Sequence, residues 1–256
     1  MFFNDLKNKF LYKFTKKYWK NINFKHAKLN NYIVQNGLMK GLKLNQDQFW
    51  NKGDLGAKIY GFYEQEVQKR ISKIAINHKK TTFINIGAAD GFFSIGLLLS
   101  KKIKKSIAFE MNINGQKSIL KNAKLNKVEN SIKVYGELNE KNFQSFFSNN
   151  FNFKNSLILC DIEGFEYELF SKKILKIIQY SHIIIEIHPT DKNKEEKLLK
   201  DVKKHFTVET IFNNINNLNQ ISSIHDLNDI ERSLLICEGR SFIGKWWILS
   251  PLNLDK

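Results

Sequence analysis

Residues 82–99, TFINIGAADGFFSIGLLL, decide the fold. The stretch begins with a β-branched and aromatic run that is typical of a short buried strand. The chain then turns through Gly87 and Gly91 and continues with apolar residues at helical spacing. A strand, a glycine turn and a helix in that order bring backbone N–H groups to a helix N-terminus, where a ligand can bind.

The turn itself indicates which ligand. Gly87 and Gly91 are four residues apart, so the dinucleotide fingerprint G-x-G-x-x-G is absent. Asp90 repels a pyrophosphate but suits a ligand that carries an ammonium group. S-adenosylmethionine has an α-amino group, a sulfonium and no phosphate, so the turn favours it. An ordinary strand–helix turn of any α/β domain is the alternative.

A second expected strand, 106–110, ends in the carboxylate of Glu110. The separation from Gly87 is close to the ~20 residues after which an acid binds the ribose hydroxyls of an adenosine ligand. Taken alone, Glu110 is better explained as a solvated strand end. Taken with the turn, it predicts an adenosine site.

Strands and helices alternate from residue 82 onward, which predicts a parallel sheet with helices on both faces. The expected strands are 82–86, 106–110, 131–135, 157–161, 182–187, 206–212 and 245–250. The expected helices are 63–77, 92–101, 113–124, 140–148, 165–178 and 193–204. The polar residues 213–233 predict a loop. Ligands bind outside the carboxyl ends of such strands, and Gly87, Glu110, Asp161 and His188 all lie at or just past these ends.

Three carboxylates stand within six residues after the strand 157–161, at Asp161, Glu163 and Glu166. Crowded carboxylates are costly unless they are paired, hydrogen-bonded or bound to a metal. Glu166 is explained as an acid that satisfies the dipole at a helix start. Asp161 and Glu163 follow a buried strand directly, so we predict a functional role for both.

His188 follows the strand 182–187 and lies beside Asp161 in the assumed topology. It is the first candidate for the general base that takes the proton from an acceptor hydroxyl. A second version uses Asp161, Glu186 and His188 to share Mg²⁺ or Mn²⁺, which lowers the pKa of the hydroxyl. We place the metal version below the metal-free one, because no tight ligand motif is present.

The motifs INIGAADGFFSIGLL, AFEMN, NAKLN, LILCDIEGFEYELF and IIIEIHP resemble the FkbM-type family of S-adenosylmethionine-dependent methyltransferases. The resemblance runs from about Gly41 to Ile187, and residues 161–166 are its most specific part. It implies a Rossmann-like seven-stranded methyltransferase sheet with helices on both faces and the last strand antiparallel. It also implies O-methylation of a hydroxyl, often in a sugar or glycan precursor.

This frame assigns the site residues. Contacts with S-adenosylmethionine are expected from Glu64, Asn85, Gly87, Ala88, Asp90, Gly91, Glu110, Met111, Glu137 and Asp161. Catalysis is expected from Asp161, Glu163 and His188. Glu64 faces the ammonium end of the cofactor in this interpretation, and otherwise caps a helix. Glu137 lies in a loop that borders the adenine in related folds, and is equally well explained as a solvated acid.

Residues 1–40 read as a basic amphipathic extension of a methyltransferase domain at 41–256. Residues 1–28 hold eight lysines and one acid, with an apolar stripe at positions 3, 6, 10, 14 and 18. We favour packing of this helix on its own domain or on a second subunit, which would make a homo-oligomer. Peripheral contact with an anionic membrane is the alternative.

The net charge of +16 comes from 41 basic and 25 acidic residues. An RNA-binding protein or RNA methyltransferase is therefore the alternative function. Only three of the basic residues are arginines, which favours a general lysine-rich composition over nucleic-acid readout. Cys160 and Cys237 give no disulfide framework, no apolar run reaches the ~18 residues of a membrane span, and no secretory cleavage site is present. We expect a cytoplasmic protein.

Overall fold

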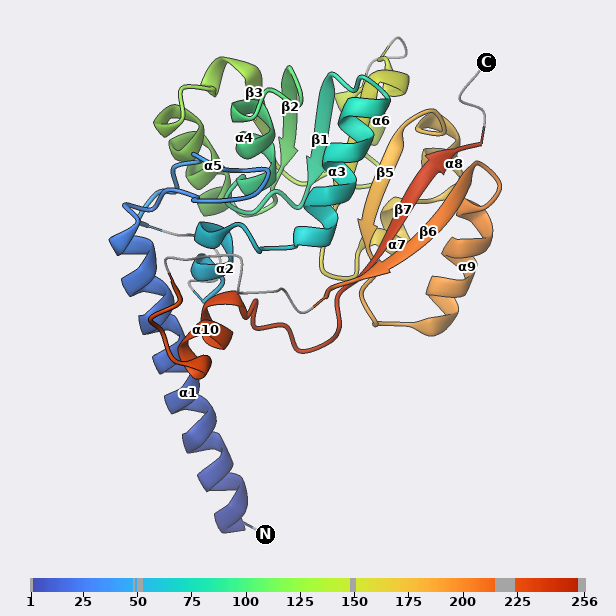
Figure 1. Ribbon diagram of the computed structural model, residues 1–256. Coiled ribbons are helices and arrows are strands. Elements are labelled where there is room, and N and C mark those ends of the chain that lie inside the picture. The colour runs from blue at the N-terminus through green and yellow to red at the C-terminus, as the bar shows by residue number, and fades with distance from the viewer. Residues whose placement is uncertain (1, 48, 50–52, 148–150, 215–223, 253–256) are drawn as a thin grey trace.

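The chain folds around a seven-stranded sheet in the computed structural model (Figure 1). The structure describes residues 2–252 except 48, 50–52, 148–150 and 215–223, and the side chains from residue 13 onward. The strand order is β3-β2-β1-β4-β5-β7-β6, and β7 runs antiparallel to both of its neighbours. The strands are β1 (Thr82–Ile86), β2 (Lys105–Phe109), β3 (Ile132–Tyr135), β4 (Ser156–Cys160), β5 (His182–Glu186), β6 (Phe206–Phe212) and β7 (Lys245–Pro251). The predicted sheet with an antiparallel last strand is confirmed.

Helices cover both faces of this sheet. One face packs against α3 (Gln65–Asn77), α4 (Phe92–Leu99) and α5 (Ile113–Leu125). The other face packs against α6 (Phe143–Phe146), α7 (Glu166–Leu169), α8 (Lys172–Ile177) and α9 (Lys192–Val202). Two short 3₁₀ helices, η1 (Glu129–Ser131) and η2 (Phe153–Asn155), lead into β3 and β4.

Each strand supplies side chains to two separate cores, because neighbouring side chains on a strand point to opposite faces. Phe83 of β1 lies in the core under α3 and α4, and Ile84 lies in the core on the other face. Trp246 and Trp247 of β7 divide in the same way, and both are buried. The sheet is therefore fully enclosed between helices along its centre.

Two sequence predictions about this region are wrong. Residues 165–178 form the two helices α7 and α8 in place of one, because Ser171 adopts an extended conformation and its side chain caps α8. The expected loop 213–233 contains the start of α10 (Asp229–Ile236), which begins where the side chain of Asn228 accepts a hydrogen bond from the Glu231 N–H. Residues 215–223 of that loop lie outside the described part of the chain.

The long first helix, α1 (Phe2–Leu29), is anchored to the domain by its C-terminal half. Trp19 and Ile22 are buried there, and α1 contacts both α2 (Leu55–Tyr60) and α10. The Trp19 indole N–H donates to the carbonyl of Leu234 at 3.0 Å. The N-terminal half extends away from the domain (Figure 1). Within the described residues, no helix combines the length and the apolar character needed to cross a bilayer.

Candidate active site at the carboxyl ends of the strands

The carboxyl ends of β2, β1, β4 and β5 meet at one edge of the sheet, because these strands are parallel neighbours. Gly87, Glu110, Asp161 and His188 follow these strands and therefore lie along that edge. Gly87 has a φ of 83°, and a Cβ atom there would lie 1.7 Å from the carbonyl oxygen of Asp161. Glycine is thus required at this position for the turn after β1 to pass so close to the end of β4.

The turn 87–91 is held against the end of β2 by hydrogen bonds. The backbone N–H groups of Gly87 and Ala88 both donate to the carbonyl of Phe109, at 2.9 Å each. The Glu110 carboxylate then accepts from the Ala89 N–H at 2.8 Å through one oxygen, and from the Asn112 N–H at 2.8 Å through the other. Glu110 is buried. The turn and the acid predicted to bind adenosine are therefore one connected unit.

Asp90, a residue of this turn, belongs to a buried ionic group. The Lys58 Nζ atom lies 3.1 Å from Asp90 Oδ2 and 3.4 Å from Asp54 Oδ2, and all three side chains are buried. Burial and the neighbouring Asp90 raise the pKa of Asp54 to about 6, against the opposing charge of Lys58. Asp90 thus fixes the turn through Lys58, and its contact with a cofactor ammonium group stays a prediction.

Arg240 pairs with three acids next to the end of β5. Its guanidinium contacts Glu64 at 2.6 Å, Glu238 at 2.7 Å and Glu186, and each of the three is mostly or fully buried. Glu64 has a left-handed φ of 45°, and its N–H donates to Glu238. Burial raises the pKa of Glu64 to about 8 despite Arg240, with help from Glu186 and Glu238. Glu64, predicted at the cofactor, is thus tied to the acids beside Asp161.

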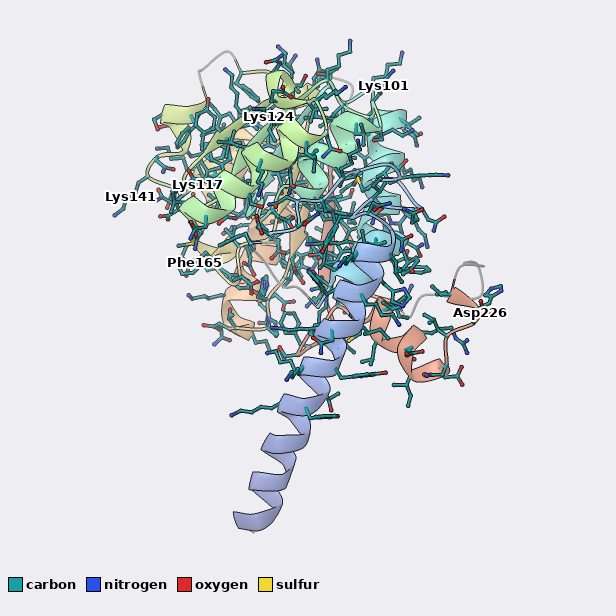
Figure 2. All side chains as sticks on the ribbon, turned by 90° about the vertical axis from the view of Figure 1, so that its left-hand side faces the viewer. Lys101, Lys117, Lys124, Lys141, Phe165 and Asp226 are labelled. Atoms are coloured by element: carbon teal, nitrogen blue, oxygen red, sulfur yellow. The ribbon has the colours of Figure 1, made fainter. Side chains whose placement is uncertain are left out.

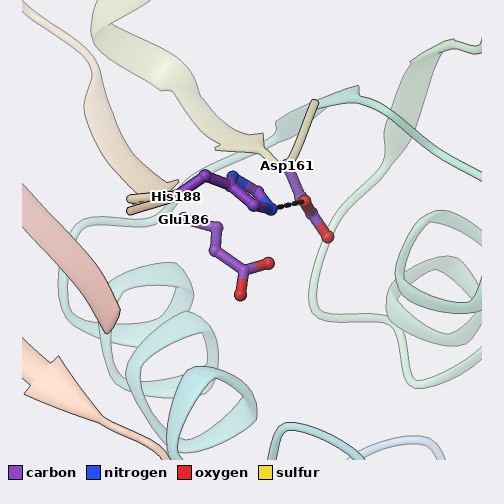
Figure 3. Close-up of side chains that lie close together, drawn as sticks. All are labelled: Asp161, Glu186 and His188. Atoms are coloured by element: carbon purple, nitrogen blue, oxygen red, sulfur yellow. Dashed lines mark ion pairs between the residues drawn. The ribbon is translucent and has the colours of Figure 1, made fainter. Parts of the chain in front are cut away.

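Asp161, Glu186 and His188 point toward one another (Figure 3). His188 Nε2 lies 3.7 Å from Asp161 Oδ1 and 3.4 Å from Glu163 Oε2. The other ring nitrogen, Nδ1, lies 3.3 Å from Glu166 Oε1, which also accepts the His188 backbone N–H at 2.9 Å. His188 is therefore enclosed by three carboxylates.

These contacts shift the pKa values of His188, Asp161 and Glu163. Burial disfavours the charged imidazolium, but hydrogen bonds to Glu163 and Glu166 outweigh it and raise the pKa of His188 to about 10. Burial and the Glu186 and Glu64 carboxylates raise the pKa of Asp161 well above its usual range. The hydrogen bond from His188 lowers the pKa of Glu163, which burial opposes. The protonated form of His188 is thus favoured, and Asp161 is the more basic of the two neighbouring acids.

The remaining predicted residues have varied surroundings. Asn85 is buried and donates to a serine of α4 at 3.1 Å, and Gly91 starts α4 with a φ of 82°. Ala88 is buried in the turn. Met111 and Glu137 follow β2 and β3 and are exposed, so both are accessible to a ligand at this edge.

Several members of the site were not found from the sequence, among them Arg240 and Glu166. Arg240 has acidic partners up to 176 residues away in the chain, and its only sequence signal is that arginine is rare here. Glu166 was assigned to a helix start, yet it is fully buried and holds both the backbone and the ring of His188. The sequence position of Glu166 at the start of α7 fits both roles equally well.

Several solved structures that resemble this chain are methyltransferases. The methyltransferase domain of METTL16 is 13% identical, with 82% of this chain and 74% of that chain covered and a TM-score of 0.52. An O-methyltransferase from Bacillus cereus in complex with SAH is 10% identical, with 71% and 79% covered and a TM-score of 0.48. TrmK from M. capricolum in complex with S-adenosyl-homocysteine is 17% identical, with 71% and 66% covered and a TM-score of 0.42.

No protein-family model matches this sequence, and no curated protein matches it. The likeness to the METTL16 domain establishes the Rossmann-like methyltransferase fold. The resemblance of the motifs to the FkbM-type family is a finer assignment, and it stays a prediction.

Proposed function

We propose that this chain transfers the methyl group of S-adenosylmethionine to a hydroxyl of a sugar or glycan precursor. The observation that carries the proposal is the unit formed by the turn 87–91 and Glu110, which stands beside Asp161 and His188 at the edge where this fold binds ligands. The hydroxyl acceptor and its sugar class come from the motif resemblance to the FkbM-type family.

The residues at this edge fit such a cofactor. Each oxygen of Glu110 accepts one backbone N–H and keeps a further lone pair, so the carboxylate can also accept from two ribose hydroxyls. Five acids, Glu64, Asp161, Glu163, Glu186 and Glu238, face the cations Arg240 and His188. This surplus of acids over cations suits a cationic ligand, whose sulfonium supplies the methyl group when it is bound.

The chain's own task is to align the acceptor hydroxyl, remove its proton and exclude water. Asp161 is the better placed proton acceptor, because its Oδ1 atom is buried and has no hydrogen-bond partner among the described residues. Its raised pKa brings it closer to the range in which a general base is effective. His188 holds Asp161 and Glu163 in place from the opposite side.

The acidic edge argues against an RNA acceptor. A phosphate backbone would approach the same five carboxylates, while the labelled lysines of Figure 2 point outward into solvent. We expect no retention of generic RNA in a gel shift at moderate salt, because nonspecific electrostatic binding weakens steeply with salt. Salt-resistant retention would favour the RNA methyltransferase instead.

Replacing Glu110 by Ala tests the cofactor assignment. We expect the affinity for S-adenosylhomocysteine, measured by titration calorimetry, to fall about 10–100-fold, because hydrogen bonds to a charged acceptor are lost. The exposed Glu140 offers a matched control, and Glu140→Ala should bind like the wild type. Unchanged affinity in Glu110→Ala would remove Glu110 from the ribose role, and no binding by the wild-type chain would contradict the proposed function.

A further inference from the structure

The side chains at the ends of β4 and β5 are arranged as a cation site, and we propose that this chain binds a divalent metal ion through Asp161, Glu186 and His188. Among the described residues, these three form the group whose potential ligand atoms all lie within 4.8 Å of one another. Ligands at about 2.1 Å from an ion are at most about 4.2 Å apart, so small side-chain movements complete the site. The role of the ion in methyl transfer rests on the function proposed above.

Glu166 gives His188 the orientation that a metal ligand needs. Its Oε1 atom accepts from the His188 backbone N–H at 2.9 Å and faces Nδ1 at 3.3 Å. With the Nδ1 proton directed at Glu166, release of the Nε2 proton on metal binding leaves that nitrogen facing Asp161 and Glu163. A buried carboxylate behind the ring is the usual partner that fixes the tautomer and direction of a metal-binding histidine.

Among the described residues, no cationic side chain pairs with both Asp161 and Glu186. Asp161 Oδ1 is buried without a hydrogen-bond partner among the described residues, and Glu186 is buried next to it. Arg240 neutralises Glu186 at Oε1, on the side that faces away toward Glu64 and Glu238. Neighbouring carboxylates repel unless a proton or a cation lies between them, and an ion at this position removes that repulsion.

The donor set indicates which ion. Two carboxylate oxygens suit Mg²⁺ and Mn²⁺, and the single imidazole nitrogen shifts the preference toward Mn²⁺. Glu163, which lies 3.4 Å from Nε2 and is largely exposed, is available as a further ligand. An ion held here would lower the pKa of a hydroxyl bound to it and so ease the loss of the proton that Asp161 accepts when no ion is bound.

Titration of the full chain with Mn²⁺ after removal of metal by EDTA tests the site, with free Mn²⁺ followed by electron paramagnetic resonance. We expect saturable binding to the wild type. Glu166→Gln should weaken it by about 10–100-fold, as expected for a lost outer partner, and Asp161→Asn should weaken it further. Glu168→Gln is the matched control, since Glu168 is exposed and pairs with Lys194, and it should bind Mn²⁺ like the wild type.

Absence of saturable binding in the wild type, or wild-type affinity in a folded Asp161→Asn variant, would overturn the metal proposal. Circular dichroism shows whether each variant is folded. S-adenosylhomocysteine binding is measured separately on the same samples. Binding of that ligand without Mn²⁺ binding rejects the ion and leaves the methyltransferase proposal standing, and the reverse result rejects the methyltransferase proposal alone.

The outer face of α1 carries a second, independent inference: we infer that it lies on an anionic membrane surface. The inner face of the helix, with Trp19 and Ile22, is buried against the domain. The face away from this contact exposes Phe14, of which 65% is accessible, together with Phe24, and Tyr18 is exposed at its flank. In both overall views the N-terminal half of α1 extends clear of the domain (Figures 1 and 2).

The charge of this helix selects the partner. Six lysines and no acid lie between Lys13 and Lys28, so a second copy of the same helix would be repelled. Lysines beside exposed aromatic side chains are typical of helices that lie in the interface of an anionic bilayer. The segment contains no arginine, which disfavours a nucleic-acid partner.

Flotation of the full chain with lipid vesicles tests this surface. We expect binding to vesicles that contain phosphatidylglycerol and none to pure phosphatidylcholine. Replacing both Lys17 and Lys25 by Glu should lower the partition coefficient onto these vesicles at least about tenfold. Replacing Lys104 and Lys133, which are exposed elsewhere, by Glu should leave it unchanged. Equal losses in both double variants, no flotation at all, or a dimer broken by the α1 reversals would each overturn the inference.

Discussion

Replacing Asp161 by Asn is expected to lower the rate of methyl transfer by about 10²–10⁴-fold, the usual contribution of a proton acceptor. Asn has nearly the same shape but cannot take the proton of the acceptor hydroxyl. Asp161 is also a ligand of the proposed metal site, and its loss would remove the ion as well. Affinity for S-adenosylhomocysteine should change much less than turnover, because Glu110 and the turn 87–91 remain intact.

The same substitution is expected to stabilise the fold. Burial, Glu186 and Glu64 raise the pKa of Asp161 in the folded chain. A carboxyl with a raised folded-state pKa stabilises the fold at low pH and loses that contribution as pH rises through the raised value. Asn carries no charge at any pH. The gain in unfolding temperature of Asp161→Asn should therefore grow from acidic to alkaline pH.

Thermal unfolding in the presence of a chelator measures this gain in unfolding temperature. A labelled-methyl screen of nucleotide sugars and glycans identifies the acceptor with which the rate of methyl transfer is then measured. Asp226→Asn is the matched control, because Asp226 is exposed and distant from the site (Figure 2). It should leave both the rate and the unfolding temperature unchanged. A variant at Asp161 with wild-type turnover would exclude this carboxylate as proton acceptor.

The strands could be predicted from the sequence because their apolar runs are short and bounded by polar turns. The bounds of β1 and β6 agree with the prediction, and those of the other strands lie within one residue of it. Helices were less accurate where side chains decide the ends. Ser171 divides α7 from α8 through a cap that competes with helix continuation, and the pattern of apolar residues contains no sign of it.

The site was predictable only where strand order places residues together. Asp161 and His188 follow adjacent parallel strands, so topology alone brings them to one edge. The pair of Lys58 with Asp90 and the pairs of Arg240 with Glu64 and Glu186 form through tertiary packing across long stretches of chain. Local sequence carries no information on such pairs, since lysine and arginine are most often exposed. Sequence reasoning therefore brought Asp161 and His188 to the same edge and missed the cations Arg240 and Lys58 that pair with the neighbouring acids.

Replacing Lys58 by Met is expected to destabilise the chain by about 3–5 kcal/mol, as for other buried ion pairs that lose one partner. Lys58 is buried between Asp54 and Asp90, and its ammonium also lies over the Tyr63 ring at 4.9 Å. Met keeps most of the apolar stem but leaves two buried carboxylates unpaired. The turn 87–91 is held through Asp90, so affinity for S-adenosylhomocysteine should fall as well.

The loss of stability in Lys58→Met should depend on pH in a defined direction. In the wild type, burial and Asp90 raise the pKa of Asp54 to about 6. The positive charge of Lys58 opposes this rise. Without Lys58, Asp54 binds a proton more readily in the folded chain, so acid pH relieves the cost and alkaline pH increases it. Denaturant unfolding at several pH values measures the difference in unfolding free energy between the variant and the wild type. Lys121→Met breaks an exposed pair with Asp47 and should cost at most about 0.5 kcal/mol. Equal losses in both variants would show that the buried group does not hold the turn.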